Sequence, residues 1–119
     1  MGRRSRRRRD GQTAKQPPVE YADGEGNVLA LRCTLSAASR VRYAETLAGS
    51  PLSIDDARER AMELLFEQLA AGWTIAGAPL ERQRDLLARL RAASREEREW
   101  VRRTLRAHCA EYFPDVDVA

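Results

Sequence analysis

The sequence predicts an α+β domain that is predominantly helical, in which a short N-terminal β-hairpin packs on about four helices. Two observations support this class. Four segments after residue 35 repeat apolar residues at helical spacing and begin near capping residues. One segment before them alternates apolar and other residues around a glycine-rich turn. The turn between the last two helices is short, so we expect these two helices to form an antiparallel helical hairpin.

The N-terminal hairpin is predicted over residues 19–35. Residues 23–27, with the sequence Asp-Gly-Glu-Gly-Asn, are a dense turn signal between two β-favouring segments. Residues 73–75, with the sequence Trp-Thr-Ile, also favour β-structure, and we expect either a third strand or a buried loop there. The second segment of the hairpin should direct one face toward the core, which would carry Leu29, Leu31, Cys33 and Leu35.

The helix boundaries follow from capping serines and from glycine or proline stops. Ser94 and Glu97 have the spacing of a capping box, and Ser53 with Asp56 resembles one. Leu80 and Gln83 should lie on the inner side of the third helix, since they match its apolar repeat. The four helices are expected over residues 36–48, 53–71, 80–93 and 95–112.

The charge of the chain is divided unevenly between its two parts. Residues 1–18 hold six Arg and one Lys against one Asp, so they carry +6, whereas residues 19–119 hold 14 Arg against 17 acidic residues and carry −3. Residues 1–18 have no apolar periodicity and end in Pro17-Pro18. We therefore expect a disordered arginine-rich arm over residues 1–18 and a single helical domain with an N-terminal hairpin over residues 19–119.

The arginine cluster of the arm is the sharpest candidate for a binding function. Guanidinium groups bind phosphates through charge and through bidentate hydrogen bonds. The cluster holds no aromatic residue on which a base could stack, so association with nucleic acid would have no sequence preference. Anionic lipid, an acidic protein partner and a merely compositional tail are the alternatives. The candidate nucleic-acid-binding residues are Arg3, Arg4, Arg6, Arg7, Arg8 and Arg9.

A second set of candidates would contact a protein partner. Four arginines recur along one flank of the last helix, beside its apolar stripe, and a lone tryptophan follows the second helix. The same arginines could instead pair with the acidic second helix, and the tryptophan could fold back on the core. A helix-turn-helix is disfavoured, because two acids in the first turn of the last helix would face phosphates. The partner-contact candidates are Arg95, Arg98, Arg102, Arg106 and Trp73.

No pattern in the sequence is typical of a catalytic, cofactor or metal site. The two cysteines, Cys33 and Cys109, do not form a CxxC pair, and His108 is the single histidine. We therefore predict no metal site, no cofactor and no disulfide framework, with both thiols buried and His108 at the edge of the core. His108 and Cys109 should not face each other, because neighbouring positions on a helix point about 100° apart. Whether Cys33 approaches His108 is left open.

These observations favour a non-enzymatic binding module, and an enzyme is the least favoured class. In the first hypothesis the arm associates with nucleic acid without sequence preference. In the alternative, the protein is a protein-protein interaction or homo-oligomeric assembly subunit, in which the acidic second helix mates with the basic last two helices of another subunit. The N-terminal arginines lead into Asp10-Gly11-Gln12 and no apolar run approaches about 18 residues. We therefore expect no signal peptide, no membrane span and a cytoplasmic location.

Overall fold

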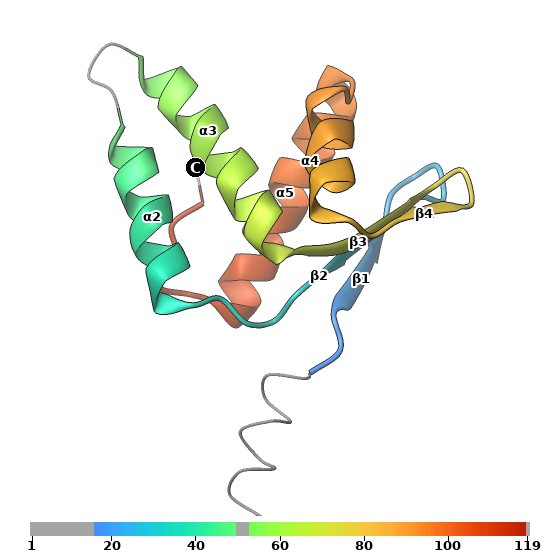
Figure 1. Cartoon of the computed structure of the whole chain (residues 1–119), viewed down its shortest axis with the longest axis horizontal. Helices are drawn as coiled ribbons and strands as arrows, with labels where there is room; N and C mark the ends of the chain where they lie inside the picture. Colours follow the sequence, from blue (N-terminus) through green and yellow to red (C-terminus); the bar gives the residue numbers. More distant parts are fainter. Residues whose placement is uncertain (1–15, 50–52, 119) are drawn as a thin grey trace, which may run out of the picture.

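The computed structural model of this chain describes residues 16–49 and 53–118 (Figure 1). It confirms the α+β class, with a predominance of helix and an N-terminal hairpin. The predicted disorder of residues 1–18 falls, apart from residues 16–18, outside the described residues. The elements in chain order are β1 (Val19–Ala22), β2 (Val28–Leu31), α2 (Ala37–Ala48), α3 (Ile54–Leu69), β3 (Ala70–Ile75), β4 (Ala78–Leu80), α4 (Gln83–Arg91) and α5 (Arg95–Tyr112).

The strands form one antiparallel sheet in the order β1-β2-β3-β4. Its register aligns Tyr21, Leu29, Trp73 and Leu80 across the sheet. Residues that face each other in neighbouring strands share one face of a sheet, so these four side chains point the same way. Leu29 and Trp73 are 0% and 2% exposed, which identifies this face as the inner one. The third strand suggested by the Trp-Thr-Ile segment is thus confirmed as the end of β3.

The second hairpin corrects the predicted start of the third helix. Leu80 belongs to β4, where it pairs with Trp73, because the chain reverses at Ala76 and Gly77 with φ angles of 51° and 80°. The helix begins only at Gln83, whose exposed side chain donates a hydrogen bond to the carbonyl oxygen of Glu67 at 2.9 Å. The second predicted helix is also shorter than expected, since α3 ends at Leu69 and the chain passes directly into β3.

The helices bury the inner face of the sheet and enclose the core. α2 and α3 lie side by side, and α4 and α5 run in opposite directions on either side of a turn at residues 92–94 (Figure 1). Phe66 of α3 meets the indole of Trp73 edge to face, with 5.7 Å between ring centroids. Cys109 is fully buried as expected, whereas Cys33 is only partly buried because it lies beyond the end of β2. Within residues 16–49 and 53–118, no helix is long and apolar enough to cross a bilayer.

Gly49, which ends α2, is predicted to be the glycine least tolerant of substitution in the described chain. It has a φ of 47°, and an added Cβ would overlap the Cβ of Ala57 and lie 2.9 Å from the carbonyl oxygen of Thr46. We expect Gly49→Ala to lower the free energy of unfolding by about 3 kcal/mol, of which about 1 reflects backbone strain at a positive φ and about 2 overpacking. Urea denaturation measures this change.

Gly26→Ala is the matched control for this substitution. Gly26 has a φ of 84°, but nothing lies within 4 Å of an added Cβ there. Its replacement should therefore cost only about 1 kcal/mol of backbone strain. Equal losses for the two variants would show that the close approach of α2 to Ala57 does not constrain the fold.

Candidate functional site

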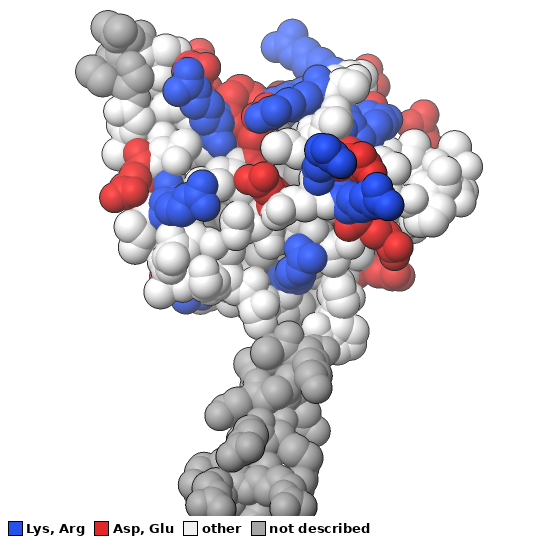
Figure 2. Space-filling view, in the orientation of Figure 1, with Lys and Arg blue, Asp and Glu red and all other residues white. Residues whose placement is uncertain are grey.

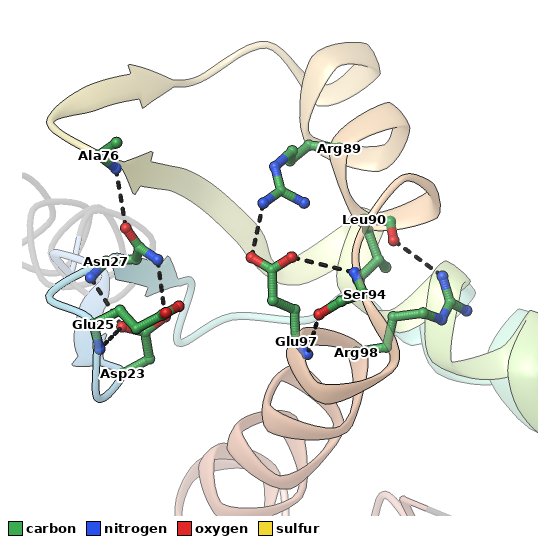
Figure 3. A network of polar contacts seen from close by, with 9 residues as sticks. All are labelled: Asp23, Glu25, Asn27, Ala76, Arg89, Leu90, Ser94, Glu97 and Arg98. Carbon is green, nitrogen blue, oxygen red and sulfur yellow. Dashed lines mark hydrogen bonds and ion pairs between the residues drawn. The ribbon is translucent and has the colours of Figure 1, made fainter.

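A cleft of about 840 Å³ lies between the turns of the two hairpins and the beginning of α5. Both turns and α5 reach it from separate parts of the sequence. Hydrogen bonds link some of its polar groups (Figure 3). We call it the turn–helix cleft. Its lining residues are Asp23, Gly24, Glu25, Asn27, Ile75, Ala76, Arg89, Ser94, Glu96, Glu97, Trp100 and Arg103.

Side-chain hydrogen bonds from Asp23 and Asn27 hold the rim formed by the two turns. The Asp23 carboxylate accepts hydrogen bonds from the backbone N–H groups of Glu25 and Asn27 at 2.8 and 3.0 Å. The Oδ1 atom of Asn27 then accepts from the backbone N–H of Ala76 at 3.0 Å, which joins the two turns (Figure 3). Burial alone would raise the pKa of Asp23, but these hydrogen bonds outweigh it and lower the pKa.

The opposite wall of the cleft begins at the capping box of α5, which confirms the sequence prediction. Ser94 Oγ accepts from the Glu97 N–H at 3.1 Å, and Glu97 Oε1 accepts from the Ser94 N–H at 3.2 Å. The second oxygen of Glu97 binds Arg89 at 2.7 Å, and the Arg89 guanidinium lies 5.4 Å from the centroid of the Trp73 ring. Arg89, on the wall of the cleft, is therefore held between the buried indole of Trp73 and the carboxylate of Glu97. Figure 3 shows its ion pair with Glu97.

Several polar groups of the cleft have no partner in the described chain. Glu25, Glu96 and Arg103 form no ion pair among residues 16–49 and 53–118, and all three are exposed. Trp100 is partly buried and offers an aromatic surface beside them. The lining holds four carboxylates against two guanidinium groups, which gives the cleft a formal charge of −2. It can therefore attract a cationic group.

The structure gives the four arginines predicted along α5 two different environments. Arg98 forms ion pairs with Glu59 and Glu63 of α3, and Arg102 forms an ion pair with Glu59. Burial alone would raise the pKa of Glu59, but the hydrogen bonds and charges of Arg98 and Arg102 lower it. Arg95 and Arg106 are exposed and form no ion pair within the described residues. The pairing between acidic and basic helices that could have joined two subunits occurs here within one chain.

The remaining predicted site residues lie elsewhere. Trp73 is 2% exposed, so its indole packs in the core and is not presented on the surface of this chain. The arm arginines, from Arg3 to Arg9, lie outside the described residues. Acidic and basic side chains are interspersed over the face drawn in Figure 2, and no large patch of one sign covers it.

His108 forms the most deeply buried polar network of the molecule's described part. It is 0% exposed, so it lies within the core. The prediction that it lies at the edge of the core is therefore wrong. Its Nε2 lies 2.7 Å from the carbonyl oxygen of Arg32, and its Nδ1 lies 2.7 Å from the hydroxyl of Tyr21. A carbonyl can only accept, so Nε2 carries the proton and Nδ1 accepts from Tyr21. Burial lowers the pKa of His108, which favours this neutral form.

These contacts leave no nucleophile–base pair at His108. The Arg32 carbonyl and the Tyr21 hydroxyl occupy both ring nitrogens, so Cys33 does not bond to the imidazole. Burial, together with the charge of Asp115, raises the pKa of the Cys109 thiol to about 11, which keeps it protonated at neutral pH. Within the described ranges, no group of three or more His, Cys, Asp or Glu residues could hold a metal ion.

Comparisons with protein-family models, with curated proteins and with solved structures found no match to this chain.

The turn–helix cleft was not predicted from the sequence, although parts of its walls were. The turn at residues 23–27 and the capping box were both predicted, but nothing in the sequence places them side by side. The second turn was missed because Pro79 and the leucine repeat favoured a helix start there. A usable signal was the spacing of Asp23 and Asn27, whose short side chains commonly bond to backbone groups within a turn.

We predict that His108 makes the stability of the fold depend on pH. An unfolded imidazole titrates near pH 6.5, whereas the pKa of folded His108 is lower. Between these values the unfolded state binds more protons, so the contribution is complete above about pH 6.5 and is lost as the pH falls. The free energy of unfolding should fall by up to about 1.4 kcal/mol per pH unit below that point. Urea unfolding at pH 7.5 and 5.5 would measure it.

His108→Gln is the control for this effect. The chain has one histidine, so this variant has no imidazole that can titrate in that range. It should be less stable than the wild type at pH 7.5 but show little further loss on moving to pH 5.5. The same loss in both proteins would assign the pH dependence to other groups.

Proposed function

We propose that this protein is a small non-enzymatic binding module that associates with nucleic acid through its arginine-rich arm, without reading sequence. The observation that carries the proposal is the division of charge. The arm, residues 1–18, holds six of the 20 arginines and carries +6, whereas residues 19–119 carry −3. Phosphate backbones attract the first part and repel the second.

The ion pairs of α5 support the arm as the phosphate-binding element. Arg98 and Arg102 have side chains that are only 22% and 21% exposed, and both bind Glu59. To bind phosphate, either guanidinium would have to leave this carboxylate in a partly buried site, which costs more than using a solvated arginine. Only Arg95 and Arg106 on this flank are exposed and without an ion pair in the described chain.

The proposal predicts a large effect of salt on binding to duplex DNA. Six arginines can neutralise about six phosphates, and each contact contributes about −0.9 to the slope of log K against log salt. The full chain should therefore give a slope of about −5. Fluorescence anisotropy of a short labelled duplex, and of a short labelled RNA, measures the affinity at several salt concentrations.

Two full-length variants locate the interaction. The arm variant, in which Arg3, Arg4, Arg6, Arg7, Arg8 and Arg9 are all serine, should lose most of its affinity and its salt dependence. The α5 variant, with Arg95→Ser and Arg106→Ser, should bind nearly as tightly as the wild type. Undiminished binding by the arm variant, or loss of binding by the α5 variant alone, would contradict the proposal.

A second candidate function, self-association, is favoured by the outer face of the sheet. The inner face is covered by helices, but Val28, Ala30, Gly72 and Thr74 on the other face are only partly buried. A groove of about 220 Å³ lies over this face, and Glu20 and Glu81 also line it. Small apolar side chains on a partly exposed sheet can pack against another copy of the same surface.

We predict that this second function would be visible in the mass of the protein in solution. If the outer face mediates assembly, sedimentation equilibrium should show a dimer that Ala30→Glu disrupts, because the new carboxylate would be buried at the interface. Val41→Glu is the control, since Val41 is 55% exposed on α2, away from the sheet. A monomer at every concentration would argue against self-association.

A further inference from the structure

The turn–helix cleft already shows how it holds one arginine. Arg89 lies against the Trp73 ring, 5.4 Å from its centroid, while its guanidinium binds Glu97 at 2.7 Å. An aromatic face and a carboxylate together satisfy both the charge and the planar surface of a guanidinium. Arg89 and Glu97 line the cleft, whereas Trp73 lies behind them in the core.

The rest of the cleft lining offers a second aromatic ring and two further carboxylates. Trp100 is partly buried on α5, and Glu96 and Glu25 are exposed carboxylates that form no ion pair within the described residues. No described arginine is stacked on Trp100; the two described cation–π contacts are Arg89 on Trp73 and Arg40 on Phe113. Arg103 reduces the negative charge of the cleft, but the lining still sums to −2.

We propose that the turn–helix cleft is the docking site for the arginine-rich segment of the same chain, residues 3–9. Arginines of this segment would stack on Trp100 and pair with Glu25 and Glu96. The charges are complementary, since the segment contributes six guanidinium groups and the cleft is acidic. This segment is the best-matched occupant, because no other part of the chain carries a comparable density of arginine.

The length of chain before β1 is sufficient for this contact. The cleft lies at the turn that follows β1, so the arm, which joins β1 at Val19, must run back along the four residues of that strand. This distance is about 13 Å at 3.3 Å per residue. Nine residues lie between Arg9 and Val19, and the ten steps from one to the other can span up to about 33 Å. A groove of about 400 Å³ between β1 and α5 leads along the same path and shares Trp100 and Arg103 with the cleft.

Docking would make the cleft a regulator of the arm. The inference rests on the proposed function in one respect, which is that nucleic acid and the cleft compete for the same arginines. An arm that is docked for half to nine-tenths of the time would lower the apparent affinity for nucleic acid about two- to tenfold. Glu25→Gln combined with Glu96→Gln should therefore raise the affinity of the full chain by that factor.

The direct test compares two full-length proteins by NMR, without nucleic acid. In the wild type at low salt, the indole N–H of Trp100 and the backbone amides of Glu25 and Glu96 should differ in chemical shift from those of the arm variant. The Trp100 signal is assigned with Trp100→Phe. The two spectra should coincide near 1 M salt, where the screening length falls to about 3 Å.

Matched charge changes separate the cleft from a general electrostatic effect. In proteins that carry both Glu25→Gln and Glu96→Gln, replacing the arm arginines with serine should no longer change the chemical shifts of the cleft residues. The control pair, Glu45→Gln and Glu99→Gln, removes two exposed carboxylates that do not line the cleft and should leave the difference intact. Loss of the difference in both pairs would overturn the assignment of the cleft.

The two proposals can fail independently. Identical cleft spectra for the wild type and the arm variant at low salt would overturn docking, whatever the affinity for nucleic acid. A shift that grows with protein concentration would place the arm of a second copy in the cleft and overturn the intramolecular form. If the shifts appear but neither duplex nor RNA binds, docking stands and the nucleic-acid function fails.

Discussion

The position of the N-terminal hairpin depends on one buried imidazole. His108 of α5 accepts a hydrogen bond from Tyr21 of β1 and donates one to the carbonyl of Arg32, just after β2. These contacts join residues 87 and 76 positions apart in sequence. The hairpin turn forms one wall of the turn–helix cleft and α5 forms another, so the imidazole also sets the geometry of the candidate site. A neutral histidine suits this position, because a buried imidazolium without a counter-charge would be costly.

A second constraint divides the arginines into structural and available groups. Glu59 and Glu63 of α3 bind Arg98 and Arg102, so part of the arginine flank of α5 holds two helices together. Arg89 is similarly engaged by Glu97 and Trp73. These ion pairs are partly exposed and contribute modestly to stability. Their larger effect is on the surface, where basic side chains lie next to acidic ones on the face drawn in Figure 2. The unbalanced positive charge of the chain therefore lies before β1.

Local features of the fold were predictable from the sequence, whereas its long-range contacts were not. The capping box at Ser94 and the turn at residues 23–27 depend on neighbouring residues, and both were identified. β4 was missed because a three-residue strand containing Pro79 is indistinguishable from a helix start until it pairs with β3. Likewise, pairing of the α5 arginines with α3 was only one of two alternatives, since sequence alone does not fix which helices are neighbours. The cleft needs two turns and a helix brought together, so no local pattern could predict it.

We propose that the arginines before β1 bind phosphate, while Arg98 and Arg102 of α5 hold α5 against α3. NMR spectra of the arginine side-chain N–H groups of the full chain, recorded during titration with unlabelled duplex DNA, test it directly. We expect the signals of Arg3–Arg9 to shift, while those of Arg98 and Arg102 keep the positions set by Glu59. Shifts at Arg98 and Arg102, or at the exposed Arg95 and Arg106, with the arm signals unchanged, would contradict it.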